Sequence, residues 1–163
     1  MVMEDGYPRL LEIPRRSFFL FGPRGVGKSF WLRRKLPGVL TFDLLHTATQ
    51  LELTRDPSLL EARIGPQKEG TWIWVDEVQK VPALLDEVHR LMELKRWRFA
   101  LSGSSARKLF REGADLLAGR AVTRRMESLA RPELGADFDL PQALAWGTLP
   151  LVVPDYGSAR DVL

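Results

Sequence analysis

Residues 17–34 read SFFLFGPRGVGKSFWLRR, and this stretch decides the fold. It begins with the apolar run 17–21, which is typical of a strand buried on both faces of a parallel sheet. A glycine-rich turn follows, and residues 28–36 predict a helix that ends at Pro37-Gly38. An apolar strand that passes through a glycine-rich turn into a helix predicts the first unit of an α/β sheet.

Further apolar stretches follow along the chain and alternate with helical patterns. Strands are predicted at 39–45, 70–77, 97–105 and 119–129. Helices are predicted at 46–64, broken at Asp56-Pro57, at 82–95, where leucines recur at helical spacing, and from residue 106 onward. Beyond residue 130 the pattern weakens to two short helices. The alternation predicts an α/β fold with a parallel sheet of about five strands and helices on both faces.

Composition limits the classes of function. The chain has 163 residues, a net charge of +3 and no cysteine, so disulfides and thiolate metal sites are excluded. No apolar run approaches the roughly 18 residues of a membrane span, and the N-terminus does not read as a signal peptide. We therefore expect a cytoplasmic protein with no membrane partner. Arginine pairs such as Arg15-Arg16 and Arg124-Arg125 form either a solvated surface or contacts to nucleic acid phosphates.

The glycine-rich turn matches the pattern G-x-x-x-x-G-K-[ST] of a phosphate-binding loop. Glycines let successive backbone N–H groups turn inward around an anion, and the following helix directs its partly positive end to the same place. Lys28 can reach the β- and γ-phosphates, and the Ser29 hydroxyl suits Mg²⁺. The predicted nucleotide-binding residues are Gly22, Pro23, Arg24, Gly25, Val26, Gly27, Lys28, Ser29 and Phe30.

A second motif, WIWVDE at 72–77, places two carboxylates at the end of an apolar strand. In open α/β sheets ligands bind at the carboxyl ends of strands. We expect Asp76 to hold Mg²⁺ together with Ser29, and Glu77 to orient and deprotonate the water that attacks the γ-phosphate. Such a pair favours hydrolysis over transfer to a small acceptor. The alternative is a pair of acidic residues that only caps the start of a helix.

Two further positions are candidates for catalysis. Ser102 ends the next predicted strand and is our first choice for a γ-phosphate sensor, with Ser104 close behind it. A serine-rich turn that caps the following helix is an alternative that explains both residues nearly as well. Arg120 is a candidate arginine finger, acting in the same chain or from a neighbouring subunit, and a structural ion pair is its alternative.

Taken together, the segments GPRGVGKS, WVDEVQKVP, ALSGSSARKL and DLLAGRA resemble the AAA-type ATP-binding domain of a large bacterial and archaeal family. The resemblance covers roughly residues 10–150, including WGTLP at 146–150. It implies a P-loop NTPase fold with ATP and Mg²⁺ as ligands, and it places Gln79 at a position that links the nucleotide to neighbouring loops. Members usually continue into a C-terminal domain, so we expect a P-loop domain at 1–130 and, at 131–163, the start of a truncated or absent second domain.

Three functions follow from these motifs. The first is an AAA-type ATPase that converts Mg²⁺-dependent ATP hydrolysis into a conformational change. The second is a nucleotide-dependent switch with little turnover, which binds another copy, a different protein or, on the basis of charge alone, DNA. A P-loop kinase is the third, and the Asp76-Glu77 pair argues against it. Because no guanine-reading N-K-x-D motif occurs, the sequence favours ATP and ADP as ligands.

Overall fold

The computed structural model describes residues 6–107, 109 and 117–154. Five strands form one all-parallel sheet in the order β2-β3-β4-β1-β5. The strands are β1 (Phe18–Phe21), β2 (Leu40–Asp43), β3 (Trp72–Asp76), β4 (Arg98–Gly103) and β5 (Val122–Arg125). The predicted fold class is therefore confirmed. The strands are shorter than predicted because residues at their ends leave the sheet to begin the turns.

The central strands β1, β3 and β4 are buried on both faces, which explains their continuous apolar runs. Along β1, Phe18 and Leu20 face one side, where they pack with the helix α1 (Lys28–Lys35). Phe19 and Phe21 face the other side. Because side chains alternate along a strand, one unbroken run supplies both cores.

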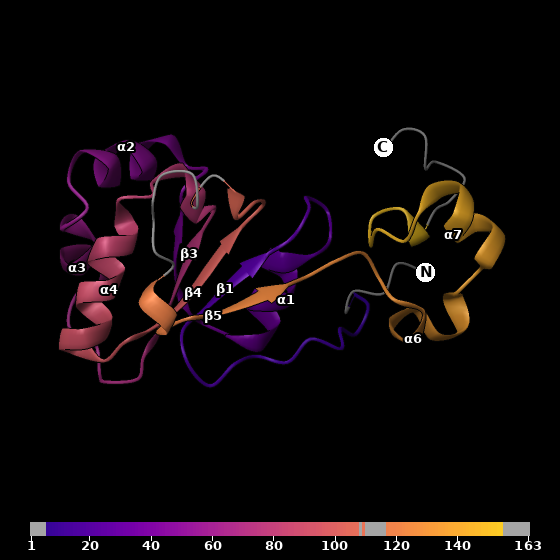
Figure 1. Ribbon diagram of the computed structural model, residues 1–163, viewed down its shortest axis with the longest axis horizontal. Coiled ribbons are helices and arrows are strands. Elements are labelled where there is room, and N and C mark those ends of the chain that lie inside the picture. The colour runs from indigo at the N-terminus through magenta and orange to yellow at the C-terminus, as the bar shows by residue number, and fades with distance from the viewer. Residues whose placement is uncertain (1–5, 108, 110–116, 155–163) are drawn as a thin grey trace.

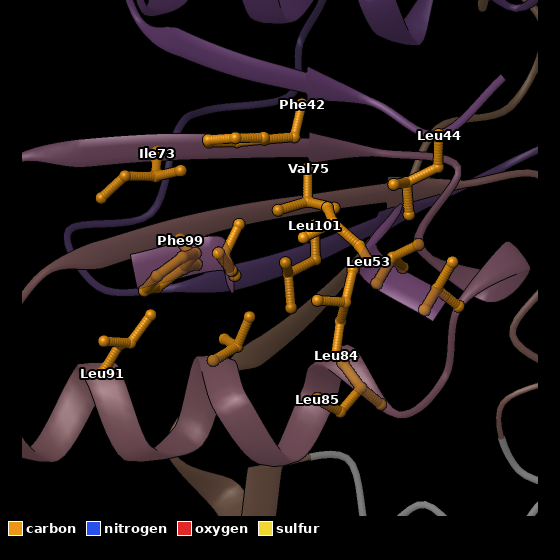
Figure 2. Close-up of a cluster of buried hydrophobic side chains, with 14 of the residues drawn as sticks. Phe42, Leu44, Leu53, Ile73, Val75, Leu84, Leu85, Leu91, Phe99 and Leu101 are labelled. Carbon is orange, nitrogen blue, oxygen red and sulfur yellow. The ribbon is translucent and has the colours of Figure 1, made fainter. Parts of the chain in front are cut away.

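The larger core lies beneath the helices α2 (Thr47–Arg55), α3 (Leu59–Ile64) and α4 (Leu84–Lys95), which gather on one side of the sheet (Figure 1). Figure 2 shows α4 directing leucines towards β2, β3 and β4. The break between α2 and α3 falls at Asp56-Pro57, as predicted. The labelled side chains of this core are Phe42, Leu44, Leu53, Ile73, Val75, Leu84, Leu85, Leu91, Phe99 and Leu101.

Short elements complete the described chain. The 3-10 turn η1 (Val78–Lys80) follows β3, and a second 3-10 turn, η2 (Leu117–Gly119), precedes β5. After β5 come α6 (Arg131–Leu134), the turn η3 (Gly135–Asp137) and α7 (Leu140–Trp146), at the end of the molecule away from α2–α4 (Figure 1). The helix predicted to start at residue 106 falls largely outside the described residues. In the described part of the chain, no helix has the length and apolar character needed to cross a membrane.

The N-terminal segment packs against the region after β5 rather than standing apart from it. The Arg9 guanidinium lies 3.3 Å from the Glu133 carboxylate, and both side chains are more than nine-tenths buried. Glu133 also accepts hydrogen bonds from the backbone N–H groups of Leu10 and Ala130. The Tyr7 hydroxyl donates to Asp137 at 2.9 Å. Segments more than 120 residues apart in sequence therefore form one unit beside the sheet.

Candidate nucleotide-binding site

The loop between β1 and α1 has the backbone conformation that its glycines predict. Gly25 and Gly27 have φ angles of 81° and 90°, a region that favours glycine. Gly22 is required for a different reason, because a Cβ there would lie 2.0 Å from the Met126 carbonyl oxygen. The Met126 N–H in turn donates a hydrogen bond to the Phe21 carbonyl oxygen at 2.8 Å. The close approach of these two backbones determines where the loop begins.

The Lys28 side chain folds back onto its own loop. Its ammonium donates to the Gly22 carbonyl at 2.6 Å and to the Pro23 carbonyl at 2.8 Å. Burial lowers the pKa of Lys28 below its ordinary value, while the negative charges of Glu77 and Asp76 act in the opposite direction. An ammonium group that already lies among backbone dipoles can exchange its two carbonyl partners for phosphate oxygens with little movement.

Asp76 is held by three donors at the carboxyl end of β3. Ser29 Oγ lies 3.2 Å from Asp76 Oδ2. Ser102 donates to Asp76 Oδ1 at 2.5 Å, and the Glu77 N–H donates to the same oxygen at 3.0 Å. Ser102 in turn accepts from the Trp74 indole N–H at 2.6 Å. The predicted partners Ser29 and Asp76 are thus brought together from different elements.

Glu77 adopts an unusual backbone conformation for a residue with a side chain, with φ 55° and ψ 42°. This left-handed conformation is uncommon outside glycine and costs free energy, so it is often found at functional sites. The carboxylate accepts a hydrogen bond from the Gln79 amide, which also donates to Ser104 at 3.1 Å. A Cβ on Gly103 would lie 2.1 Å from the Gln79 amide oxygen, so glycine makes room for this side chain.

Magnesium can be tested against the donors that are present. Mg²⁺ takes hard oxygen ligands and usually binds through one or two carboxylates together with substrate phosphates. The Ser29 hydroxyl and the Asp76 carboxylate provide such oxygens beside the phosphate loop. No group of three or more histidine, cysteine or acidic side chains that could hold a metal occurs in the described parts of the chain. The donor set fits a metal that is shared with a bound nucleotide.

A cleft of about 1430 Å³ lies between the phosphate loop, the segment that starts at Gly6 and the region after β5. Phosphate-loop residues and Glu77 line one part of it. Phe30 also faces the cleft, and its ring lies under the Arg34 guanidinium at 5.8 Å. The opposite wall comes from the N-terminal segment and the region after β5, and includes Tyr7, Pro8, Leu129, Asp137, Asp139, Gln142, Leu151 and Val153.

Sequence reasoning missed this second wall. Its residues come from segments that lie far apart in the chain, and no local motif marks them. The single available signal was the apolar stretch 149–153, which we did not connect with the loop. The wall adds apolar surface and carboxylate acceptors to a site that the motifs described only at its phosphate end.

Arg120 does not join the site of its own chain. It precedes β5, whose first residue, Val122, lies beside Phe18 at the start of β1. The phosphate loop follows the other end of β1, so Arg120 lies at the opposite edge of the sheet. There its guanidinium pairs with Glu93 at 2.6 Å. Arg24, by contrast, is exposed within the loop and lines the cleft.

A glycine loop between a central strand and a helix, with an acidic residue on a nearby strand, defines a P-loop nucleotide-binding protein. The chain belongs to the AAA domain family, whose model matches residues 14–134. This confirms the resemblance inferred from the motifs. Comparison with curated proteins found no match.

Among solved structures, the fold is similar to that of the Orc1 protein of Aeropyrum pernix, determined in complex with DNA. The TM-score is 0.51 at 14% sequence identity, and the match covers 88% of this chain. It covers 50% of the Orc1 chain, so this chain spans about half the length of that protein. At this identity the similarity supports the fold alone.

Proposed function

We propose that this protein binds ATP with Mg²⁺ and hydrolyses it, and that hydrolysis drives a conformational change. The observation that carries the proposal is the position of Glu77. Its strained backbone directs a carboxylate to the wall of the cleft that contains Lys28. This carboxylate can orient a water molecule and accept its proton as the water attacks the γ-phosphorus.

Each of the other site residues has a part in this mechanism. Lys28 leaves the Gly22 and Pro23 carbonyls and donates to the β- and γ-phosphates, while the loop N–H groups bind the remaining oxygens. Ser29 and Asp76 would hold Mg²⁺, which neutralises charge that develops on the phosphates. The side of the cleft formed by Tyr7 and Pro8 receives the base and ribose. Charge stabilisation and positioning are the main contributions expected in phosphoryl transfer.

The test is phosphate release from ATP and Mg²⁺ by the purified chain, with Glu77→Gln as the matched variant. Replacing a carboxylate by an amide of the same shape removes the proton acceptor but leaves the fold and the phosphate contacts. We expect turnover to fall by about 10²–10⁴-fold, the usual contribution of general base catalysis, with little change in ATP affinity. Equal turnover in the two proteins would remove Glu77 from this role.

A second candidate function is a nucleotide-dependent switch with little turnover by the single chain. Arg120 favours it, because in its own chain this arginine lies too far from the phosphates to stabilise the charge of the transition state. A neighbouring copy would then have to supply an arginine. A DNA partner is a further proposal, supported by exposed basic residues such as Arg15, Arg16 and Arg33. Turnover that rises steeply with protein concentration would favour self-association.

A further inference from the structure

A buried chain of hydrogen bonds leads from an indole to the proposed metal ligand. Trp74 and Asp76 are two residues apart on β3, so their side chains emerge on the same face of the sheet. In the next strand, Trp74 lies beside Ala100 and Val75 beside Leu101, which brings Ser102 opposite Asp76. The Ser102 hydroxyl thus lies between the Trp74 indole, at 2.6 Å, and the Asp76 carboxylate, at 2.5 Å.

The chemistry of the three groups determines the direction of these bonds. An indole N–H can only donate, whereas a serine hydroxyl has one proton and two acceptor lone pairs. Trp74 therefore occupies a lone pair of Ser102, and the single Ser102 proton is directed to Asp76 Oδ1. Trp74 is 1% exposed and Ser102 is 0% exposed, so water does not compete for these positions.

The consequence for Asp76 is that its two oxygens differ. Oδ1 already accepts from Ser102 and from the Glu77 N–H. Among the described residues, Oδ2 has one hydrogen-bond partner, Ser29, at the longer distance of 3.2 Å. Two donors on Oδ1 hold the plane of the carboxylate. They leave Oδ2 directed towards the Ser29 hydroxyl, the other ligand of the proposed metal site.

We propose that Trp74 is a positioning residue for the magnesium-binding carboxylate, acting through Ser102 on the orientation of Asp76. The proposal rests on the proposed function only in taking the Ser29–Asp76 pair as the metal site. Partners that hydrogen-bond to metal ligands orient those ligands, and their loss typically lowers metal affinity 10- to 100-fold. In this scheme Ser102 orients Asp76, and the sensing of the γ-phosphate passes to Ser104, which hydrogen-bonds with Gln79.

The experiment uses Mn²⁺ as the probe and measures its binding by electron paramagnetic resonance, in the presence of a saturating non-hydrolysable ATP analogue. Trp74→Phe keeps an aromatic ring in the core but removes the N–H. We expect Mn²⁺ affinity to fall about 10-fold in this variant, while metal-free affinity for the analogue stays unchanged.

Trp72→Phe is the matched control. Trp72 lies on the same strand and the same face, and its ring packs against Phe18 at 5.6 Å and under the Arg98 guanidinium at 5.9 Å. In the described structure the hydrogen bonds to Ser102 and Asp76 come from other residues than Trp72, so its substitution should leave Mn²⁺ affinity unchanged. An equal loss in Trp72→Phe and Trp74→Phe would mean a general packing effect and would overturn the proposal.

A double variant tests whether Trp74 acts through Ser102. Ser102→Ala removes the bond to Asp76 directly and should weaken Mn²⁺ binding at least as much as Trp74→Phe. Adding Trp74→Phe to Ser102→Ala should cause no further loss, because the intermediate hydroxyl is already gone. Losses that add would overturn the proposal, as would unchanged Mn²⁺ affinity in folded Trp74→Phe.

A measurement on proteins that keep Trp74 covers the case in which Trp74→Phe does not fold. The indole ¹H–¹⁵N resonance of Trp74 should move upfield in Ser102→Ala, because a hydrogen bond to a hydroxyl is lost; an unmoved signal would contradict the bond. The outcomes also separate the two proposals. Absent turnover in the unchanged protein, together with weaker Mn²⁺ binding in Trp74→Phe, would refute hydrolysis but not the role of Trp74. Normal turnover in the unchanged protein, together with unchanged Mn²⁺ binding in Trp74→Phe, would refute the role of Trp74 alone.

Discussion

At the scale of single residues, Lys28 shows how a side chain can be held ready for a ligand. Its ammonium donates to two carbonyls of the same loop and is 7% exposed. Burial lowers its pKa, so the charged form is held there at a cost that an incoming anion would relieve. The lysine is therefore more than a surface charge that happens to lie near phosphates.

Lys28→Ala should abolish or severely weaken ATP binding. The variant loses the only side-chain cation of the G-K-[ST] motif, and charge-assisted hydrogen bonds typically contribute about 1.5–3 kcal/mol each. We expect a loss of at least 10-fold in affinity for a fluorescent ATP analogue, measured by anisotropy. Lys68→Ala, which removes an exposed lysine that does not line the cleft, is the control. Equal affinities of Lys28→Ala and the unchanged protein would contradict the phosphate-loop assignment.

At the scale of elements, the N-terminal segment and the region after β5 act as one wall of the cleft because Arg9 and Glu133, on α6, join them. The pair is buried, and Glu133 also receives two backbone N–H groups. Removing one member of a buried pair leaves the other charge uncompensated, which typically costs about 3–5 kcal/mol. The wall should therefore loosen when Glu133 is replaced, while the phosphate loop, built from β1 and α1, should remain.

Glu133→Ala should weaken ATP binding but leave the binding of inorganic tripolyphosphate unchanged, because only ATP carries a base and ribose for the wall to contact. Isothermal titration with both ligands measures the two affinities. Glu127→Ala is the control, since its carboxylate pairs with Arg125 at the surface and is 61% exposed. A parallel loss of both ligands would show that the change had reached the phosphate loop.

At the scale of the whole molecule, the nucleotide would contact three parts that lie far apart in the chain. The cleft is formed by the phosphate loop, the N-terminal segment and the region after β5. A ligand that contacts all three stabilises the folded state by mass action, by about 2.7 kcal/mol at a ligand concentration 100 times the dissociation constant.

Mg²⁺ and a non-hydrolysable ATP analogue should therefore raise the Tm by about 5–10 °C at that concentration, given the usual shift per kcal/mol for a chain of this size. Differential scanning fluorimetry measures the shift. Lys28→Ala should show about half of the shift or less at the same concentration, since a 10-fold loss of affinity lowers the stabilisation to about 1.4 kcal/mol. A full shift in Lys28→Ala would mean that the analogue binds somewhere other than the phosphate loop.

Sequence reasoning was most successful where the signal is local. The strand, loop and helix around Lys28, the Asp76-Glu77 pair and the break at Asp56-Pro57 depend on neighbours in the chain, so the pattern carries them. Arg120 is different, because its motif does not show where β5 lies in the sheet. β5 pairs in parallel with β1, so a residue that precedes β5 lies at the end of the sheet away from the phosphate loop.

The sequence by itself determined the P-loop unit, the alternation of strands and helices, and the two acidic residues at the end of β3, because backbone preferences and burial act on adjacent residues. Only the tertiary structure decided which side chains meet. The strand order 2-3-4-1-5 places Ser102 between Trp74 and Asp76. The folding of the N-terminal segment onto α6 builds the second wall of the cleft. Such contacts join residues 26 to more than 120 positions apart, and the packing of the whole chain brings them together.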